Sequence, residues 1–191
     1  KVLNVWSIKR HGHTETFLDM AKDISKSCKG QVIPDMYSRL GVNDRRDAYD
    51  NVLYKKANVL PLFHGTRTQN LVGITKAGLL IRPHNAVLTG AMYGNGIYTS
   101  SHSSKSINYT NIKTSYWTNG SDDKAFLFIA DTTLGNQKIV NGSGSYSKNK
   151  INPNHSVWAK GGHSGVINDE MVIYDTNQIT LRYLIEFTCR N

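Results

Sequence analysis

The segment 178–187 has the clearest hydrophobic pattern in this chain. Apolar and polar residues alternate strictly, so that every second residue from 179 to 187 falls on one apolar face. Successive side chains of a β-strand point to opposite faces of a sheet, and the alternation therefore predicts a strand. Leu184 is the single apolar residue on the otherwise polar face. We expect this strand to be covered on both sides.

Shorter apolar runs predict further strands, at residues 2–9, 59–63, 124–131 and 170–174. Helical spacing of apolar residues predicts a helix over 17–28, which begins with a capping box at Thr16. Smaller helices are expected at 69–77, closed by Gly78, and from about residue 101 past Tyr109.

Polar and glycine-rich segments predict loops at 34–50, 83–96, 111–123 and 141–165. The first is expected to contain a short helix, and the segment 155–158 interrupts the last. The chain thus has mostly strands, a few short helices and no repeating strand–helix–strand order. This organisation excludes a doubly wound parallel sheet and predicts an α+β fold.

The composition is that of one globular domain of 191 residues, with 39% hydrophobic residues and a net charge of +9. The charge is uneven, because residues 1–82 hold 14 lysines and arginines against 7 acids. A basic surface favours polyanionic partners such as nucleic acid, acidic proteins or a dinucleotide.

Several classes of protein are disfavoured by what the sequence lacks. No apolar run has the length of a membrane span, and the first residues do not resemble a signal peptide, so we expect an intracellular protein, nuclear or cytoplasmic, that does not bind membranes. Cys28 and Cys189 do not have the spacing of a zinc site, and His11 with His13 lacks a third ligand, so no metal is expected. No Walker loop or Gly-x-Ser-x-Gly elbow is present.

Three segments carry the residues with the most chemical content. The first, residues 62–70, contains His-Gly-Thr-Arg. The second, residues 94–98, reads Gly-Asn-Gly-Ile-Tyr and is followed by Ser-Lys-Ser-Ile-Asn-Tyr at 104–109. The third, residues 168–175, begins Asn-Asp-Glu-Met-Val. In this order they resemble the His, Tyr and Glu motifs of the poly(ADP-ribose) polymerase catalytic domain. Each motif alone is weak, but three in the family's order are hard to obtain by chance.

The resemblance covers most of residues 59–187. Further matching segments lie at 78–81, 89–98, 155–157 and 178–184. It implies the ADP-ribosyltransferase fold, in which two packed antiparallel β-sheets with short flanking helices surround a cleft that binds NAD. Residues 1–191 would form one catalytic domain, with 14–58 as an insertion and without the helical regulatory subdomain of the damage-responsive members.

The chain departs from the family pattern at three places. Asn95 stands where a lysine is common, and Leu80 stands where several polymerases carry an arginine near the adenosine. The acceptor-side loop between His155 and Glu170 is shorter than in the damage-responsive members.

The resemblance implies three catalytic residues, Glu170, His64 and Tyr98. Cleavage of the nicotinamide–ribose bond builds positive charge on the ribose, so a well-placed carboxylate is the main chemical requirement. Glu170 would contact the 2′-hydroxyl of that ribose and stabilise the charge, with Asp169 as a bystander. His64 would hold the adenosine ribose through its 2′-hydroxyl.

The resemblance also implies a site for NAD as co-substrate. The main chain of Gly65 and the hydroxyl of Ser106 would hold the nicotinamide carboxamide, and Tyr98 and Tyr109 would enclose its ring. The full set of NAD-binding residues would be His64, Gly65, Thr66, Asn70, Tyr98, Ser106 and Tyr109.

The implied activity is NAD-dependent transfer of ADP-ribose to a macromolecule. The short acceptor-side loop favours one unit or a short chain over a long polymer. A protein acceptor is expected, the charge leaves nucleic acid open, and we expect a monomer. Two alternatives stay open: an NAD glycohydrolase, and an inactive ADP-ribosyltransferase fold that serves as a binding module.

Overall fold

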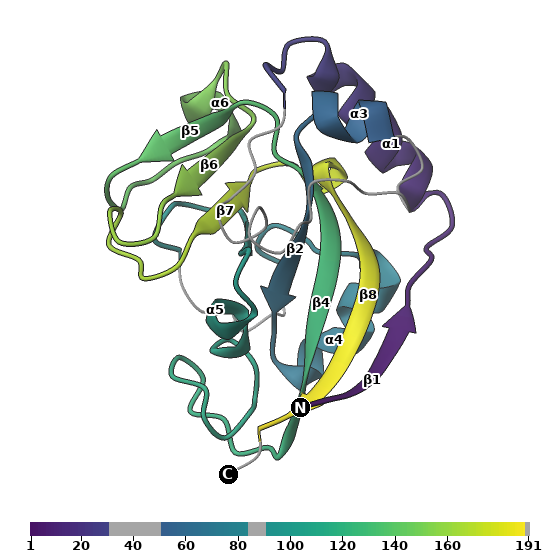
Figure 1. The fold of residues 1–191 in the computed structure, drawn as a ribbon, viewed down its shortest axis with the longest axis vertical. Coiled ribbons are helices and arrows are strands. Elements are labelled where there is room, and N and C mark those ends of the chain that lie inside the picture. Colours follow the sequence, from purple (N-terminus) through teal and green to yellow (C-terminus); the bar gives the residue numbers. More distant parts are fainter. Residues whose placement is uncertain (31–50, 84–90, 190–191) are drawn as a thin grey trace.

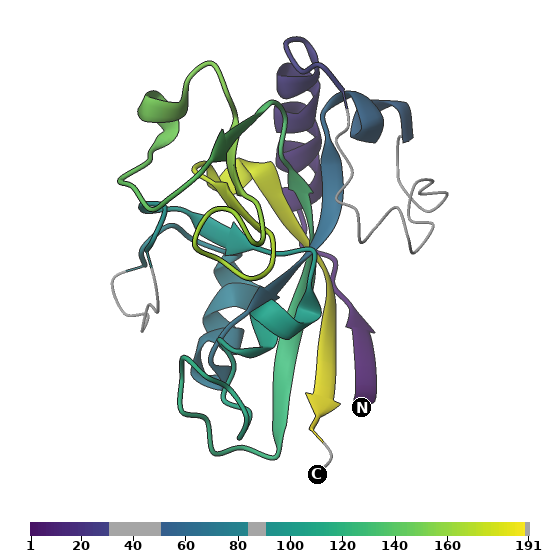
Figure 2. The ribbon, with the colours of Figure 1, turned by 60° about the vertical axis from the view of Figure 1, so that its left-hand side comes forward.

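Two four-stranded sheets with short flanking helices form the structure, a computed structural model that describes residues 1–30, 51–83 and 91–189. Figures 1 and 2 show the sheets as two layers joined near the middle of the molecule. The architecture is α+β, as the sequence predicts. In the described ranges, no helix combines the length and the hydropathy needed to cross a bilayer.

The larger layer, sheet A, is antiparallel throughout. Its strands, in spatial order, are β1 (Val2–Ser7), β8 (Ile179–Thr188), β4 (Lys124–Thr133) and β2 (Val59–Gly65). The five strands expected from the apolar runs include all four of these, with ends shifted by a few residues.

The second layer, sheet B, departs from the prediction around β5 (Gln137–Val140), which is not among the expected strands. Its order is β3 (Ile97–Thr99), β7 (Glu170–Ile173), β6 (Ser156–Ala159) and β5 (Gln137–Val140). The pairs β3–β7 and β6–β7 are antiparallel, but β5 and β6 run parallel. The expectation of wholly antiparallel sheets is wrong for this pair. The connection from β5 to β6 contains the helix α6 (Lys148–Ile151), inside the segment expected to be a loop.

The remaining helices are short, apart from α1. They are α1 (His13–Ser25), α3 (Asn51–Lys56), α4 (Leu71–Ala77) and α5 (Ser103–Ile107), with 3₁₀ turns η1 (Thr68–Asn70) and η2 (Thr176–Gln178). Helix α1 begins before Thr16, after Gly12 in a left-handed conformation, so the predicted capping box is wrong. Helix α4 ends at Gly78 as predicted, whereas α5 ends before Tyr109. The expected helix within 34–50 lies outside the described residues.

The main core lies between the two sheets. It contains side chains from β2, β4, β7 and β8, among them Leu62, Phe128, Met171 and Leu181. A second cluster packs α1 against α3 and the start of β2, with Phe17, Ala21, Leu53 and Val59 among its members. Apart from His13, the first residue of α1, both helices fall within the expected insertion 14–58, whose boundaries stay a prediction.

Strand β8 does not keep the strict alternation expected of it. Its register against β4 shifts between Leu181 and Tyr183, which makes Arg182 an additional residue, as in a β-bulge. Beyond the shift, Leu184 packs against the same core cluster as Leu181, while Ile185 packs in a different one. The bulge therefore moves the apolar face of the strand by one residue and explains the irregular Leu184.

Phe128→Ala should destabilise the fold by about 3–5 kcal/mol, because the ring is fully buried between the sheets and its loss leaves a cavity. Urea unfolding followed by fluorescence measures this. Val72→Ala, on the exposed side of α4, is the control and should change stability by no more than about 0.5 kcal/mol. Equal losses for the two variants would contradict the assignment of the core.

Candidate active site

The two sheets meet where β2 and β3 approach each other. Phe63 N donates to Ser100 O over 2.9 Å, and Ser100 N donates back to Phe63 O over 3.0 Å. This bridge places His64 next to the strand that carries Tyr98. Glu170 begins β7, and β7 pairs directly with β3. The three residues predicted to be catalytic therefore come from three adjacent strands.

The ring of His64 is held in one orientation and one tautomer. Its Nδ1 lies 2.9 Å from Tyr98 O, and a carbonyl oxygen can only accept, so Nδ1 carries the proton. Burial lowers the pKa of His64, against the smaller opposite effect of that hydrogen bond, so the ring is neutral near pH 7. The remaining nitrogen, Nε2, is then an acceptor, which suits a sugar hydroxyl.

Gly65 leaves no room for a side chain. A Cβ at this position would lie 1.7 Å from Ser106 O, which belongs to α5. Ser106 is buried, and its hydroxyl donates to Phe63 O over 3.2 Å. The glycine therefore permits the close approach of α5 to β2 and brings Ser106 beside Gly65; a shared carboxamide site at these two residues stays a prediction.

Tyr98 and Tyr109 are partly buried around the acid of the site. Burial is the main cause that raises the pKa of each tyrosine to about 12, and the charge of Glu170 makes a smaller contribution in the same direction. Both hydroxyls stay neutral at physiological pH, so the two rings present uncharged aromatic faces near the carboxylate.

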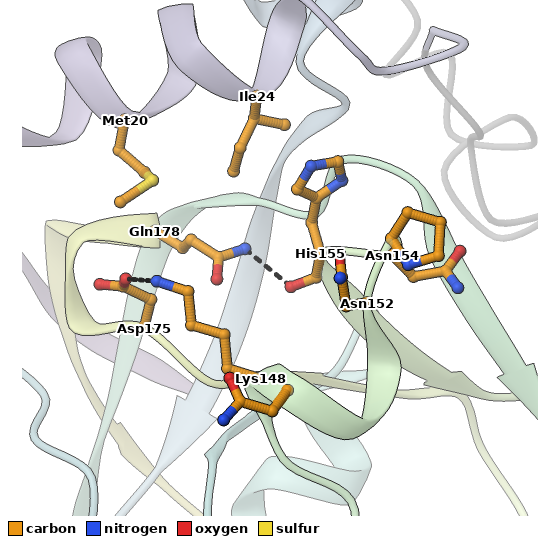
Figure 3. A pocket seen from close by; sticks show the side chains of 10 residues that line it. Met20, Ile24, Lys148, Asn152, Asn154, His155, Asp175 and Gln178 are labelled. Atoms are coloured by element: carbon orange, nitrogen blue, oxygen red, sulfur yellow. Dashed lines mark hydrogen bonds and ion pairs between the residues drawn. The ribbon is translucent and has the colours of Figure 1, made fainter.

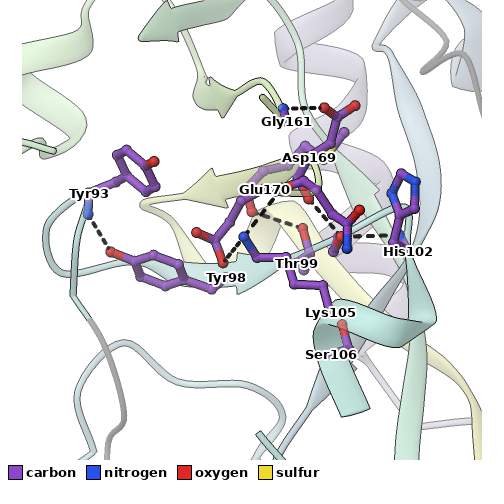
Figure 4. Close-up of polar contacts among 12 residues, drawn as sticks. Tyr93, Tyr98, Thr99, His102, Lys105, Ser106, Gly161, Asp169 and Glu170 are labelled. Carbon is purple, nitrogen blue, oxygen red and sulfur yellow. Dashed lines mark hydrogen bonds and ion pairs between the residues drawn. The ribbon is translucent and has the colours of Figure 1, made fainter. Parts of the chain in front are cut away.

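Glu170 is the buried acid of this region, with 5% of its surface exposed. Its Oε1 lies 3.4 Å from the Nζ of Lys105, which also donates to Asn168 O over 3.3 Å (Figure 4). Burial raises the pKa of Glu170, and the lysine partly offsets this. A carboxylate so placed is poorly solvated and responds strongly to positive charge near it.

Asp169 has a structural role instead. Its Oδ1 accepts from Gly161 N over 2.8 Å and closes the loop 160–169, while its main-chain oxygen accepts from the hydroxyl of Ser100 over 2.6 Å. These contacts agree with its expected place as a bystander.

Thr66 and Asn70 lie together beyond the end of β2. Asn70 Nδ2 donates to Thr66 Oγ1 over 3.0 Å, and Thr66 is buried. This pair fixes the turn that leads into η1. A contact of either residue with adenine or with the dinucleotide stays a prediction.

Lys105 was missed as a functional residue by sequence reasoning, although it stands inside a motif that the resemblance includes. A lysine between two serines on a short helix has no pattern that marks it as buried. The ion pair between Lys105 and Glu170 is what identifies this lysine, because a buried carboxylate needs a nearby cation or hydrogen-bond donor.

A separate cavity of about 360 Å³ lies between α1, α6 and η2, away from these residues (Figure 3). Gln178 forms part of its wall and donates to His155 O over 3.1 Å. Lys148 and Asp175 form an ion pair of 2.6 Å at its edge. None of the predicted catalytic or NAD-binding residues lines this cavity. Within the described ranges, no group of three potential metal ligands is found either.

Comparison with known proteins places the chain in a family. A sequence model of the poly(ADP-ribose) polymerase catalytic domain matches residues 1–189. A poly(ADP-ribose) polymerase-like protein, 100L, of Invertebrate iridescent virus 6 is 34% identical over 136 residues, which cover 66% of this chain and 70% of that protein.

Two vertebrate relatives are much longer than this chain. Human protein mono-ADP-ribosyltransferase PARP4 is 30% identical over 187 residues, which cover 92% of the chain and 10% of the human protein. Poly(ADP-ribose) polymerase 1 of Gallus gallus is 32% identical over 151 residues, which cover 65% of the chain and 14% of the chicken protein. Because the family match extends over nearly all residues, the chain belongs to the poly(ADP-ribose) polymerase catalytic domain family.

Proposed function

We propose that this chain is an active NAD-dependent ADP-ribosyltransferase that attaches one ADP-ribose, or a short chain, to a protein. The observation that carries the proposal is the buried Glu170, paired with Lys105 and close to Tyr98 and Tyr109. Members of this family use NAD as substrate, and the names of the relatives describe both mono-ADP-ribosyl and poly(ADP-ribose) transfer.

The residues of the site fit NAD in three ways. Gly65 has no side chain and packs against Ser106, whose hydroxyl donates to the adjacent Phe63 O, and the Gly65 main chain with this hydroxyl would hold a carboxamide. The neutral rings of Tyr98 and Tyr109 suit the flat nicotinamide. His64 Nε2 is an acceptor for a ribose hydroxyl.

The chemistry that NAD supplies is a good leaving group, the cationic nicotinamide. Glu170 would accept a hydrogen bond from the neighbouring ribose 2′-hydroxyl and stabilise the positive charge that develops next to it. The same carboxylate would receive the proton of an acceptor hydroxyl. Lys105 would hold Glu170 in its ionised form and in one orientation.

The acceptor side of the site is formed by the loop that precedes Glu170. The loop 160–169 is short and is closed on itself by the Gly161–Asp169 hydrogen bond, and such a loop would offer few contacts to a second ADP-ribose. We therefore favour a protein acceptor over polymer growth, and a nucleic acid remains the second candidate because of the charge of +9. Water as acceptor would make the chain an NAD glycohydrolase with the same residues.

Glu170→Gln should lower the rate of transfer by about 10²–10³-fold, since the amide keeps the shape but loses the charge that faces the ribose. Incorporation of labelled ADP-ribose into protein, together with release of nicotinamide, measures both reaction paths. Glu186→Gln is the matched control, because Glu186 lies on β8 and pairs with Lys124. Near wild-type labelling by Glu170→Gln would remove Glu170 from the catalytic role.

The acid limb of the rate should lie above pH 4.5, because burial raises the pKa of Glu170 from that ordinary value and only the ionised form is active. Transfer then declines as the pH falls through the raised pKa. Lys105→Met removes the contribution that lowers this pKa, so its acid limb should move to still higher pH.

Initial rates of nicotinamide release across a pH series test this prediction. Lys124→Met is the control for loss of a lysine that pairs with an acid elsewhere, and its profile should coincide with wild type. A Lys105→Met profile with an unmoved acid limb would contradict the coupling between Lys105 and Glu170.

The compound 3-aminobenzamide should bind the wild-type chain, because it carries the carboxamide and flat ring that the site is expected to recognise. At a hundred times its dissociation constant it would stabilise the fold by about 2.7 kcal/mol, which a melting experiment detects. Gly65→Ala should abolish the shift, since its Cβ would collide with Ser106 O.

Gly73→Ala is the matched control for the melting experiment. Gly73 lies on α4, and a Cβ there meets no atom within 4 Å. This variant should keep the full ligand-induced shift. No shift for the wild type at millimolar compound would show that the nicotinamide pocket is wrongly assigned.

A further inference from the structure

Tyr93 connects the NAD side of the site to the loop 160–169. Its main-chain N donates to the hydroxyl of Tyr98 over 2.9 Å, and that hydroxyl donates to Gly94 O over 2.7 Å. The position of the Tyr98 ring is therefore set by the short segment that contains Tyr93 (Figure 4).

The side chain of Tyr93 extends the connection in the other direction. It is fully buried, and its hydroxyl donates to Ser164 O over 2.7 Å, in the middle of the loop. The hydroxyl of Tyr174, at the end of β7, donates to Tyr93 O over 2.6 Å. Tyr93 thus contacts three segments: its main-chain N donates to Tyr98, its main-chain O accepts from Tyr174, and its hydroxyl donates to the loop 160–169.

The surroundings keep Tyr93 from shifting. Its neighbour Gly94 packs so closely on the segment around Tyr146 that a Cβ would lie 2.1 Å from Tyr146 O. Gly144 N donates to Met92 O over 2.9 Å on the same side. A movement of the loop at Ser164 would therefore strain Tyr93 rather than be absorbed by it.

The loop itself leads directly into Glu170, so its position determines what can approach the carboxylate. Apart from its own turns, the loop forms four hydrogen bonds to other segments. The hydroxyl of Ser164 donates to Val140 O, Asn168 O accepts from Lys105, Asp169 O accepts from the hydroxyl of Ser100, and Ser164 O accepts from the Tyr93 hydroxyl. Two of these contacts lead toward Tyr98. Ser100 follows the strand β3 that carries Tyr98 and holds the end of the loop, whereas Tyr93 connects the middle of the loop to the hydroxyl of Tyr98.

We propose that Tyr93 is a positioning residue that fixes the loop 160–169, part of the acceptor-side loop, relative to the bound NAD. Tyr93 thereby determines how ADP-ribose is divided between the acceptor and water. The inference rests on the proposed function. In both reactions the nicotinamide–ribose bond breaks, nicotinamide leaves, and a new bond forms to an oxygen. That oxygen belongs to an acceptor hydroxyl in transfer and to water in hydrolysis, and its proton is released in either case.

Tyr93→Phe removes the hydroxyl and keeps the ring and the main-chain contacts to Tyr98. The ratio of acceptor-bound to free ADP-ribose should fall about fivefold, the size expected for one buried hydrogen bond. The KM for NAD should stay within about twofold of wild type, and total nicotinamide release should change little. General destabilisation lowers both products together and leaves their ratio unchanged.

Two further variants make the test specific. Ser164→Ala removes the hydrogen bond from the Ser164 hydroxyl to Val140 O and should shift the ratio in the same direction. This variant tests the inference independently if Tyr93→Phe folds poorly. Tyr54→Phe removes a buried tyrosine hydroxyl in a different core cluster, where it donates to Asp131, and should leave the ratio unchanged.

The outcomes separate this inference from the proposed function. A wild-type chain that neither labels protein nor releases nicotinamide contradicts the proposed function and the inference with it. An active Tyr93→Phe variant with the wild-type ratio contradicts the inference alone, as does an equal shift in Tyr54→Phe.

Discussion

Two main-chain hydrogen bonds between Phe63 and Ser100 join the sheets, and the geometry of the candidate site depends on them. They bring the end of β2 against the end of β3, so that the carbonyl of Tyr98 meets the imidazole of His64. Main-chain bonds of this kind involve no flexible side chain, and the ring is therefore oriented before any ligand arrives. Such preorganisation is what a binding site needs if affinity is not to be lost in ordering its own groups.

The same junction controls the charge at Glu170. Gly65 allows α5 to approach β2, and α5 carries both Ser106 and Lys105. A larger residue at position 65 would displace this helix and separate the lysine from the carboxylate. A buried acid that loses its partner is destabilised in its ionised form, so the electrostatics of the site depend on a glycine that carries no charge.

Local pattern was sufficient for most strands, and it failed where distant segments decide the outcome. The alternation in 178–187 predicted β8, but the bulge at Arg182 arises from its register with β4 and has no local signature. The parallel pairing of β5 with β6 likewise depends on how a long connection returns to the sheet. The role of Lys105 was invisible for the same reason, because its partner lies 65 residues away in the sequence. The resemblance to the family supplied residue identities, while burial, tautomer and charge came only with the structure.

The cavity between α1 and α6 illustrates why size alone does not identify a catalytic site. Three of its polar side chains already have partners, since Lys148 pairs with Asp175 and the Gln178 amide donates to two main-chain carbonyls. A side chain whose charge or hydrogen bonds are already paired stabilises a new charge on a substrate only weakly. Glu170 is the opposite case: its ion pair with Lys105 spans 3.4 Å, and burial opposes its charge. A positive charge that appears beside it during reaction would be stabilised more strongly than in water, which is the property that the proposed chemistry requires.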